Sequence, residues 1–266
     1  MNCFTKMQFC LLLFLPLLLC CCDATKHPLK DSVQKKEMLI YCGTTMLQPV
    51  LELSAIVEKE KDCVVKVSYG GSTHLSKSVE VNRIGELFFP GSVSYVQGLQ
   101  EKGLISETVD VGNNEVALFV RKGNPKEVKA DLMDLIRPDL QVVIGARNAG
   151  AIGKTTQMCL IRKGIYEKVL KKAVFLTTDS KGLMQALRRN RADVVLNWLA
   201  VGYGAEYKEY VEAIRLPREQ ALQQKLTIGL LSFSQNPELG KYFLELAASS
   251  RGKEIFSRYG LYKNEI

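Results

Sequence analysis

Two short stretches of small and hydroxyl-bearing residues are the part of this sequence best suited to binding chemistry. Residues 42–46 read CGTTM, and residues 70–74 read GGSTH. Neither stretch contains an acidic residue, a lysine or an arginine. What they offer is backbone N–H groups, hydroxyl donors and the starts of helices, which together form a binding surface for an anion. The chemistry predicted from them is capture of an anion by uncharged donors.

The elements around these stretches place them at one edge of a sheet. Each stretch follows a strand-like apolar run, 38–41 in the first case and 64–69 in the second. Each also precedes a segment with the apolar spacing of a helix, which makes it a strand-to-helix turn. Two such turns from parallel strands lie side by side at the carboxyl edge of the sheet, where open α/β sheets bind ligands.

The rest of the chain alternates short strands with helices. Strands are predicted near 38–42, 64–69, 86–89, 115–121, 141–145, 173–177, 193–197 and 225–231. Helices are predicted near 45–60, 73–81, 92–101, 130–136, 151–162, 164–171, 180–190, 199–210 and 236–258. This alternation predicts an α/β fold with a mostly parallel sheet and helices on both faces. The apolar runs 114–120 and 225–231 are bounded by turn residues and are expected to link two lobes.

The first 22 residues differ from the rest of the chain. A single lysine precedes an apolar run over 7–19 that is short for a membrane span, and the sequence then turns polar. These features predict a secretory signal peptide over 1–22, with an uncleaved anchor helix as the alternative. Residues 23–37 are charged and polar without periodicity and are expected to form a tether. The protein is therefore expected to be exported to the periplasmic or cell-surface side of the membrane.

The cysteines support an exported, anchored protein. Five of the eight lie in the first 22 residues. Cys20, Cys21 and Cys22 end the apolar run and resemble a bacterial lipoprotein signal, in which one thiol becomes diacylated, although the small residue usual before it is missing. One of the three is the expected lipid anchor, and apolar filler of the leader is the alternative. The remaining cysteines are too few for a disulfide framework and are expected to be buried.

The charge pattern argues against nucleic acid as a partner. The chain has 36 lysines and arginines against 28 acidic residues, a formal net charge of +8. This balance suits anionic partners in general, but the basic residues are scattered among acids, as on solvated helix faces. Aromatic residues are not interleaved with them as in nucleic-acid-binding segments.

The sequence shows no catalytic, metal-binding or cofactor-binding pattern. His27 and His74 are isolated from other residues at ligand spacing, and no Ser-His-acid or Cys-His arrangement is visible. Residues 148–155, NAGAIGKT, lack the first glycine of a phosphate-binding P-loop, which argues against nucleotide hydrolysis. We therefore expect a binding protein and not an enzyme, with no metal and no cofactor.

Five landmarks occur in the order and spacing of a known protein family. They are LIYCGTTM at 39–46, VSYGGSTHL at 67–75, GELFFPGS at 85–92, the run 113–125 ending in KGNP, and the segment 253–261. In this order they resemble the periplasmic solute-binding proteins of ABC importers, in particular the type II group that binds molybdate and tungstate. The resemblance covers about residues 38–262. It implies a two-lobed fold in which each lobe is a mostly parallel sheet flanked by helices, with two crossing hinge strands.

The resemblance also implies how the chain divides and which residues hold the ligand. Lobe one is expected over 38–117 and 230–266, and lobe two over 118–229. In the family, hydroxyls and main-chain amides hold the oxyanion between the lobes without a counter-charge. The ligand-binding residues implied by position are Thr45, Ser72, Ile152, Ser180, Trp198 and, in place of the last, Asn197. Thr45 and Ser72 also have an ordinary interpretation as helix N-caps.

Two positions depart from the family pattern. Trp198 stands where the family has a ligand-binding tyrosine, and an indole N–H can donate a hydrogen bond but cannot accept one. The neighbouring Asn197 could supply the bond instead. Arg147 is a new charge near the predicted second-lobe part of the site, where it could pair with the anion, change specificity or simply be exposed.

The function predicted from these features is capture of a tetrahedral oxyanion, molybdate or tungstate, and its delivery to an ABC permease by a lipid-anchored monomer. Uncharged donors suit a fully ionised dianion, because a protonated ligand would turn its own donor toward other donors. Two alternatives stay open. One is a binding protein for another anion, such as sulfate, phosphate or a small organic acid. The other is a membrane-tethered sensor or accessory subunit with the same fold.

Overall fold

A computed structural model describes residues 35–262 of the chain. The predicted signal peptide, Cys20, Cys21 and Cys22, and the tether up to residue 34 lie outside the described residues. The strands are β1 (Glu37–Gly43), β2 (Val64–Gly70), β3 (Leu87–Phe89), β4 (Ile105–Arg121), β5 (Val142–Gly145), β6 (Phe175–Thr177), β7 (Val194–Trp198), β8 (Val211–Arg215) and β9 (Gln223–Leu231). The α-helices are α1 (Leu47–Lys61), α2 (Ser72–Asn82), α3 (Val93–Gln100), α4 (Ala151–Arg162), α5 (Tyr166–Lys172), α6 (Ser180–Arg188), α7 (Pro237–Ala248) and α8 (Ser250–Arg258). Three 3-10 helices are η1 (Thr44–Met46), η2 (Leu132–Ile136) and η3 (Leu199–Tyr203).

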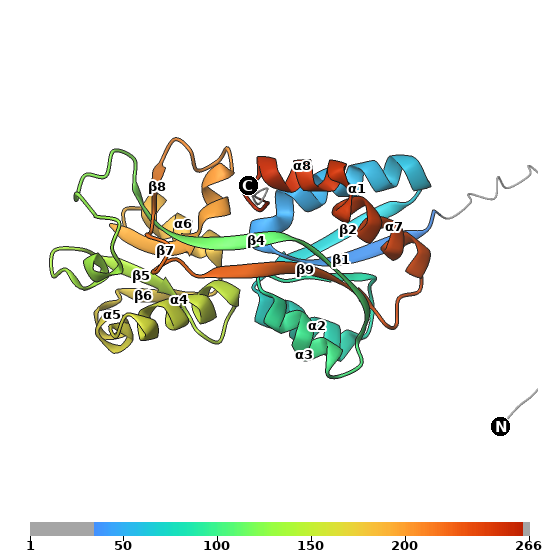
Figure 1. The fold of residues 1–266 in the computed structure, drawn as a ribbon, viewed down its shortest axis with the longest axis horizontal. Helices are drawn as coiled ribbons and strands as arrows, with labels where there is room; N and C mark the ends of the chain where they lie inside the picture. The colour runs from blue at the N-terminus through green and yellow to red at the C-terminus, as the bar shows by residue number, and fades with distance from the viewer. Residues whose placement is uncertain (1–34, 263–266) are drawn as a thin grey trace, which may run out of the picture. The chain divides into compact units, whose positions relative to one another are not determined.

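Strands β1, β2 and β3 form the parallel part of the first half of the fold. Strand β1 pairs with β2 on one side and with β3 on the other. Helices α1, α7 and α8 cover one face of this sheet, and α2 and α3 cover the other (Figure 1). Because β1 and β2 end in register, with Gly43 opposite Gly70, the two hydroxyl turns that follow them lie next to each other. The predicted adjacency of the turns is confirmed.

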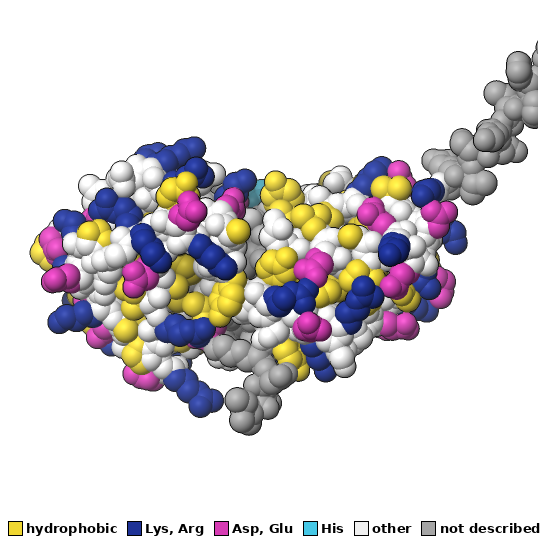
Figure 2. Space-filling model, turned by 90° about the horizontal axis from the view of Figure 1, so that it is seen from above, with side chains coloured by type: hydrophobic (Ala, Val, Ile, Leu, Met, Phe, Trp, Pro, Cys, Tyr) yellow, Lys and Arg dark blue, Asp and Glu magenta, His cyan; other side chains and the backbone are white. Residues whose placement is uncertain are grey.

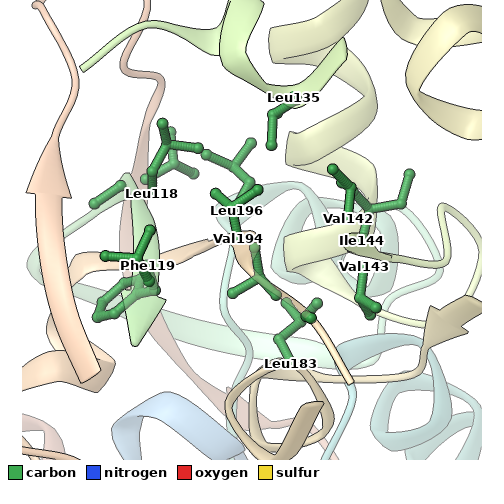
Figure 3. Close-up of a cluster of buried hydrophobic side chains, with 14 of the residues drawn as sticks. Leu118, Phe119, Leu135, Val142, Val143, Ile144, Leu183, Val194 and Leu196 are labelled. Carbon is green, nitrogen blue, oxygen red and sulfur yellow. The ribbon is translucent and has the colours of Figure 1, made fainter. Parts of the chain in front are cut away.

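The second half contains its own parallel strands, β5 with β6 and β5 with β7. Apolar side chains from β4, β5, β7 and α6 meet in the core of this half, as Figure 3 shows. Leu118, Val143, Val194 and Leu183 are all fully buried there. Strands β5 and β7 are short and almost wholly apolar, as expected when both faces of a sheet are covered.

Strands β4 and β9 run between the two halves as an antiparallel pair (Figure 1). All antiparallel pairings in the described residues involve one of these two strands. Strand β4 stays paired with β9 up to Glu115, opposite Gln223, and from Val116 onward it pairs with β7. One long strand thus belongs to both halves, with the change of partner between Glu115 and Val116.

Four predicted elements differ clearly from those observed, and one observed strand was not predicted. Strand β4 begins at Ile105, well before the expected 115, because residues 106–110 are mostly exposed and polar and lack a clear apolar alternation. The helix expected over 199–210 is only the 3-10 helix η3, which is followed by the unpredicted strand β8. Strand β8 pairs with β4 on one side and exposes Glu212 and Arg215, so its sequence lacks a strong strand signal.

The closing helix expected over 236–258 is two helices, α7 and α8. They separate at Ser249, which has an extended backbone conformation and whose hydroxyl accepts a hydrogen bond from the Gly252 N–H at 3.2 Å. A serine that caps a helix start is a favourable break point. The helix expected over 130–136 is the 3-10 helix η2, capped in the same way by Asp131. None of the helices in residues 35–262 is long and apolar enough to cross a membrane.

Candidate ligand-binding site

Four helix starts meet around one small cavity. The starts of η1 and α2 come from the first half, and those of α4 and α6 come from the second. The cavity has a volume of about 20 Å³, far below the roughly 300–1,000 Å³ of pockets that hold drug-sized ligands. It is lined by Gly43, Thr44, Thr45, Met46, Gly70, Gly71, Ser72, Gly91, Gly150, Ala151, Ile152, Thr178, Asp179, Ser180 and Trp198. A ligand of only a few atoms fits such a space.

Three of these helix starts have glycine as the N-cap residue and no side-chain cap. The glycines are Gly43 before η1, Gly71 before α2 and Gly150 before α4. In α2 and α4, the Leu75 N–H bonds to the Gly71 carbonyl and the Lys154 N–H bonds to the Gly150 carbonyl. The N–H groups before those bonds have no partner within their helix, and they lie at the positive end of the helix dipole. They are therefore available to bind an anion.

The Ser72 side chain is placed to donate a hydrogen bond into the cavity. Its residue is 3% exposed, and its Oγ accepts a hydrogen bond from the Gly91 N–H at 3.0 Å. A hydroxyl can accept and donate at the same time. Because the Gly91 amide occupies the accepting side, the hydroxyl proton stays free for a ligand.

Thr45 and Ser180 meet across the cavity from opposite halves. Thr45 Oγ1 and Ser180 Oγ lie 3.3 Å apart, and Ser180 is buried. Ile152 also lines the cavity, but its side chain belongs to the core of the second half. Only its backbone amide, in the first turn of α4, is suited to contact a polar ligand. The structure thus brings Thr45, Ser72, Ile152 and Ser180 together around one cavity.

Trp198 and Asn197 have different positions relative to the cavity. Trp198 lines it, and the indole Nε1 lies 3.8 Å from the position that a Cβ on Gly91 would occupy. Asn197 is fully buried behind the wall. Its Nδ2 donates to the Ser180 carbonyl at 3.0 Å, and its Oδ1 accepts from the Trp198 N–H at 2.9 Å. Asn197 therefore orients the two lining residues and does not itself face the cavity.

Thr44 is a cavity residue that sequence reasoning missed. Its Oγ1 is buried and has no hydrogen-bond partner among the described residues. A buried hydroxyl without a partner is costly, and such groups point to a ligand or an ordered water. The sequence alone does not show which of the adjacent threonines, Thr44 or Thr45, lies at the binding site. In the structure, the course of η1 places both of them in the cavity wall.

Two glycines, Gly71 and Gly150, lie where the two halves approach each other. A Cβ on Gly71 would lie 2.8 Å from the Ala149 carbonyl oxygen and 3.1 Å from the Thr178 carbonyl oxygen, both in the second half. A Cβ on Gly150, in the second half, would lie 3.5 Å from Gly71 Cα and 3.6 Å from the Ser72 backbone nitrogen, both in the first half. The absence of side chains at these positions is what permits the helix starts to converge.

The cavity wall carries little charge. No lysine, arginine or histidine lines it, and the one acidic residue is Asp179, whose Oδ1 accepts from the Gly182 N–H at 2.9 Å and caps α6. Arg147 is exposed and is not among the lining residues. On the face of the molecule in Figure 2, basic and acidic side chains are interspersed over both halves. Any charge on a bound anion is therefore balanced by dipoles and hydrogen bonds.

The three cysteines among the described residues do not line this cavity. Cys42, Cys63 and Cys159 are free and buried, and burial raises the pKa of the Cys159 thiol to about 11. Thiols with raised pKa values are poor nucleophiles. Within residues 35–262, no group of histidine, cysteine and carboxylate side chains could hold a metal ion.

The sequence match that decides the family covers almost all of the described chain. The model of the family described as bacterial extracellular solute-binding protein matches residues 38–262. The chain belongs to this family. The family resemblance predicted from the sequence landmarks is confirmed.

Individual relatives of this solute-binding protein are distant. A Haemophilus influenzae protein, named only as a binding protein, is 26% identical over 231 residues, which cover 86% of this chain and 92% of that protein. The molybdate-binding protein ModA of Mycobacterium tuberculosis is 20% identical over 200 residues, which cover 75% of this chain and 74% of that protein.

Solved structures confirm the fold class of this solute-binding protein. The periplasmic molybdate-binding protein of Azotobacter vinelandii has a TM-score of 0.71 at 14% identity, over 86% of this chain and 100% of that one. The sulfate-binding protein SubI of Mycobacterium tuberculosis has a TM-score of 0.76 at 14% identity, over 86% and 88% of the two chains. The predicted α/β fold of the two-lobed, type II periplasmic-binding-protein class is therefore correct.

Proposed function

We propose that this solute-binding protein captures a small tetrahedral oxyanion, molybdate or tungstate, and delivers it to an ABC permease. The observation that carries the proposal is the set of uncapped helix starts and buried hydroxyls around a cavity of about 20 Å³ that no basic side chain lines. Its ligand-binding groups are Thr44, Thr45, Ser72, Ser180 and the first amides of α4, with Trp198 closing the wall. The molybdate-binding relative and structural neighbour support this ligand class.

Uncharged donors can hold a dianion firmly when they are fixed before the ligand arrives. Hydrogen bonds from amides and hydroxyls to a charged oxygen are stronger than those between neutral groups. Helix dipoles add partial positive charge without the strong desolvation cost of a buried lysine or arginine. A cavity built in this way favours a fully ionised ligand of matching geometry.

Capture proceeds by closure of two lobes around the anion. Lobe one comprises residues 38–117 and 230–266, and lobe two comprises 118–229, apart from residues 223–229 of β9, which pair with the first-half part of β4. The lobes turn about β4 and β9, because β4 changes its partner between Glu115 and Val116. Hinge closure of this kind buries a ligand between domains and creates the form that a permease distinguishes from the open one. The protein acts as a monomer, held on the outer side of a membrane by a lipid on Cys20, Cys21 or Cys22.

The test is a titration of the exported protein with molybdate, tungstate, sulfate and phosphate by calorimetry. Trp198 is the only tryptophan in the chain, so its fluorescence reports directly on the cavity. We expect molybdate and tungstate to bind in preference to the other anions. Thr45→Ala and Ser72→Ala should each weaken binding by about 1–3 kcal/mol, as for lost hydrogen bonds to a charged group.

A matched control comes from the same turn as Ser72. Thr73 Oγ1 bonds to the Tyr95 hydroxyl at 3.0 Å and does not line the cavity. Thr73→Ala should leave the affinity unchanged. If the double variant Thr45→Ala/Ser72→Ala binds as tightly as the parent, the proposed site is wrong.

A second candidate function is binding of a protonated oxyanion such as hydrogen phosphate. The specific observation that favours it is Asp179, because a carboxylate in the cavity wall can accept a hydrogen bond from a ligand that still carries a proton. The titration with phosphate, repeated on an Asp179→Asn variant, separates the two candidates.

A further inference from the structure

A second, larger cavity lies directly beside the small one. This outer cavity has a volume of about 230 Å³, against about 20 Å³ for the inner one. It shares three wall residues with the inner cavity, Thr44, Thr45 and Ser180. A bare tetrahedral ion bound in the inner cavity would leave this additional space unfilled.

The side chains that separate the two cavities make only weak hydrogen bonds with each other. The Thr45 and Ser180 hydroxyl oxygens are 3.3 Å apart, which is long for a hydrogen bond between hydroxyls. Thr44 Oγ1, in the same shared wall, is buried without a partner. A ligand that reached from the inner into the outer cavity would separate the first two hydroxyls and offer oxygen atoms to all three.

The outer cavity is lined by three tyrosines, by aliphatic side chains and by the polar side chains of Gln48, Lys181 and Glu206, whereas no lysine lines the inner one. Tyr69 is 51% exposed and Tyr207 is 8% exposed, and Leu47 and Val201 add aliphatic surface. Burial, followed by a hydrogen bond to Glu206, raises the pKa of the Tyr207 phenol, so it stays uncharged. Such a surface suits a flat organic group, because aromatic rings pack favourably against each other.

We infer that the outer cavity holds the organic substituent of a mono-substituted oxyanion, such as an aryl or alkyl phosphonate or sulfonate, whose charged oxygens occupy the inner cavity. This inference rests on the proposed function, because it uses the inner cavity as the oxyanion site. It widens the ligand class from the bare ion to ions that carry one short organic group.

The test compares ligands with the same charged head and different substituents. Phenylphosphonate and methylphosphonate are titrated into the parent protein, with molybdate as the bare ion, by calorimetry and Trp198 fluorescence. We expect phenylphosphonate to bind about tenfold more tightly than methylphosphonate, because only its ring buries apolar surface in the outer cavity.

Filling the outer cavity provides a variant that spares the inner one. Gln48 is exposed on α1 and lines only the outer cavity, so Gln48→Phe should lower the affinity for phenylphosphonate about tenfold and leave molybdate binding within about twofold. Leu51→Phe is the control, because Leu51 is 44% exposed on the same helix and lines neither cavity. It should change neither affinity.

The outcomes separate this inference from the proposed function. If molybdate binds and phenylphosphonate does not, or if phenylphosphonate binding is unaffected by Gln48→Phe, the inference is wrong and the proposed function stands. If no oxyanion binds, bare or substituted, the proposed function fails as well. Preference for phenylphosphonate that is lost in Gln48→Phe alone supports the inference.

Discussion

Thr45 Oγ1 and Ser180 Oγ lie 3.3 Å apart although 135 residues separate them in the chain. Thr45 stands in the 3-10 helix that follows β1, and Ser180 is the first residue of α6. The contact therefore joins the two halves of the fold at the cavity wall. Each hydroxyl bonds to the other without ligand and, in the proposed function, to the oxyanion when it is bound.

We predict that Thr45→Val and Ser180→Ala each weaken oxyanion binding by about 1–3 kcal/mol, whereas their mutual contact contributes little to the stability of the free protein. A double-mutant cycle measured by urea denaturation should give a coupling energy below about 1 kcal/mol, since the contact is long and weak. Calorimetry on the same four proteins gives the effect on binding. A large coupling in the free protein with unchanged affinity would mean that the pair serves only to hold the halves together.

Thr44 leads to a prediction with opposite signs for stability and binding. Its buried Oγ1 has no partner among the described residues, so Thr44→Val removes an unsatisfied group and keeps the shape of the side chain. The free energy of unfolding of the ligand-free variant should be unchanged or higher, and oxyanion affinity should fall by about 1–3 kcal/mol. Thermal denaturation and calorimetry check the two parts. A clear loss of stability would show that the hydroxyl already has a partner, such as a bound water.

The half of the site that is local in sequence was predictable. The turns after β1 and β2 each combine an apolar strand, glycine and hydroxyl residues within about a dozen positions, and β1 and β2 are neighbours in the sheet. Thr45 and Ser72 could therefore be placed at one edge by periodicity alone. The contributions of Ile152, Ser180 and Trp198 came only through family resemblance, because they depend on strands that pair over long distances in the chain.

The features that the sequence did not predict depend on contacts between residues far apart in the chain, which no local sequence pattern indicates. Asn197 faces away from the cavity because its amide is used by the Ser180 carbonyl and the Trp198 N–H. Strand β8 is stabilised by pairing with β4 and not by its own apolar content. The close approach of Gly71 to Ala149 is likewise a property of the folded halves, and in the sequence Gly71 is only a turn residue.

Gly71 leads to a prediction about the approach of the two halves. A Cβ at this position would lie 2.8 Å from the Ala149 carbonyl oxygen, which belongs to the backbone and cannot rotate away. Gly71→Ala should therefore weaken oxyanion binding by about 1–3 kcal/mol, the usual cost of overpacking. Gly98→Ala is the control, since a Cβ there would meet nothing within 4 Å and Gly98 lines neither cavity. Calorimetry measures the oxyanion affinity of both variants. Equal affinities would mean that the two halves do not come into close contact at Gly71 when the ligand binds.

Replacing Asp179 by asparagine should change the anion affinity in a direction that depends on whether the bound ligand carries a proton. Asn at this position can still accept a hydrogen bond from the Gly182 N–H, as Asp179 Oδ1 now does at 2.9 Å. Asp179→Asn therefore keeps the cap of α6, removes the charge and replaces the second carboxylate oxygen, an acceptor, by an NH2 donor. For a dianion such as molybdate, the carboxylate repels the ligand. Asp179→Asn should then raise the affinity by about 2 kcal/mol, the Coulomb energy in water of a unit charge and a double charge about 4 Å apart. For hydrogen phosphate, the same substitution removes the acceptor for the ligand's proton, and the affinity should fall.

Titration of the parent and of Asp179→Asn with both anions at one pH therefore distinguishes the two candidate functions. A rise with molybdate and a fall with phosphate would show that the cavity admits both forms and that Asp179 selects between them.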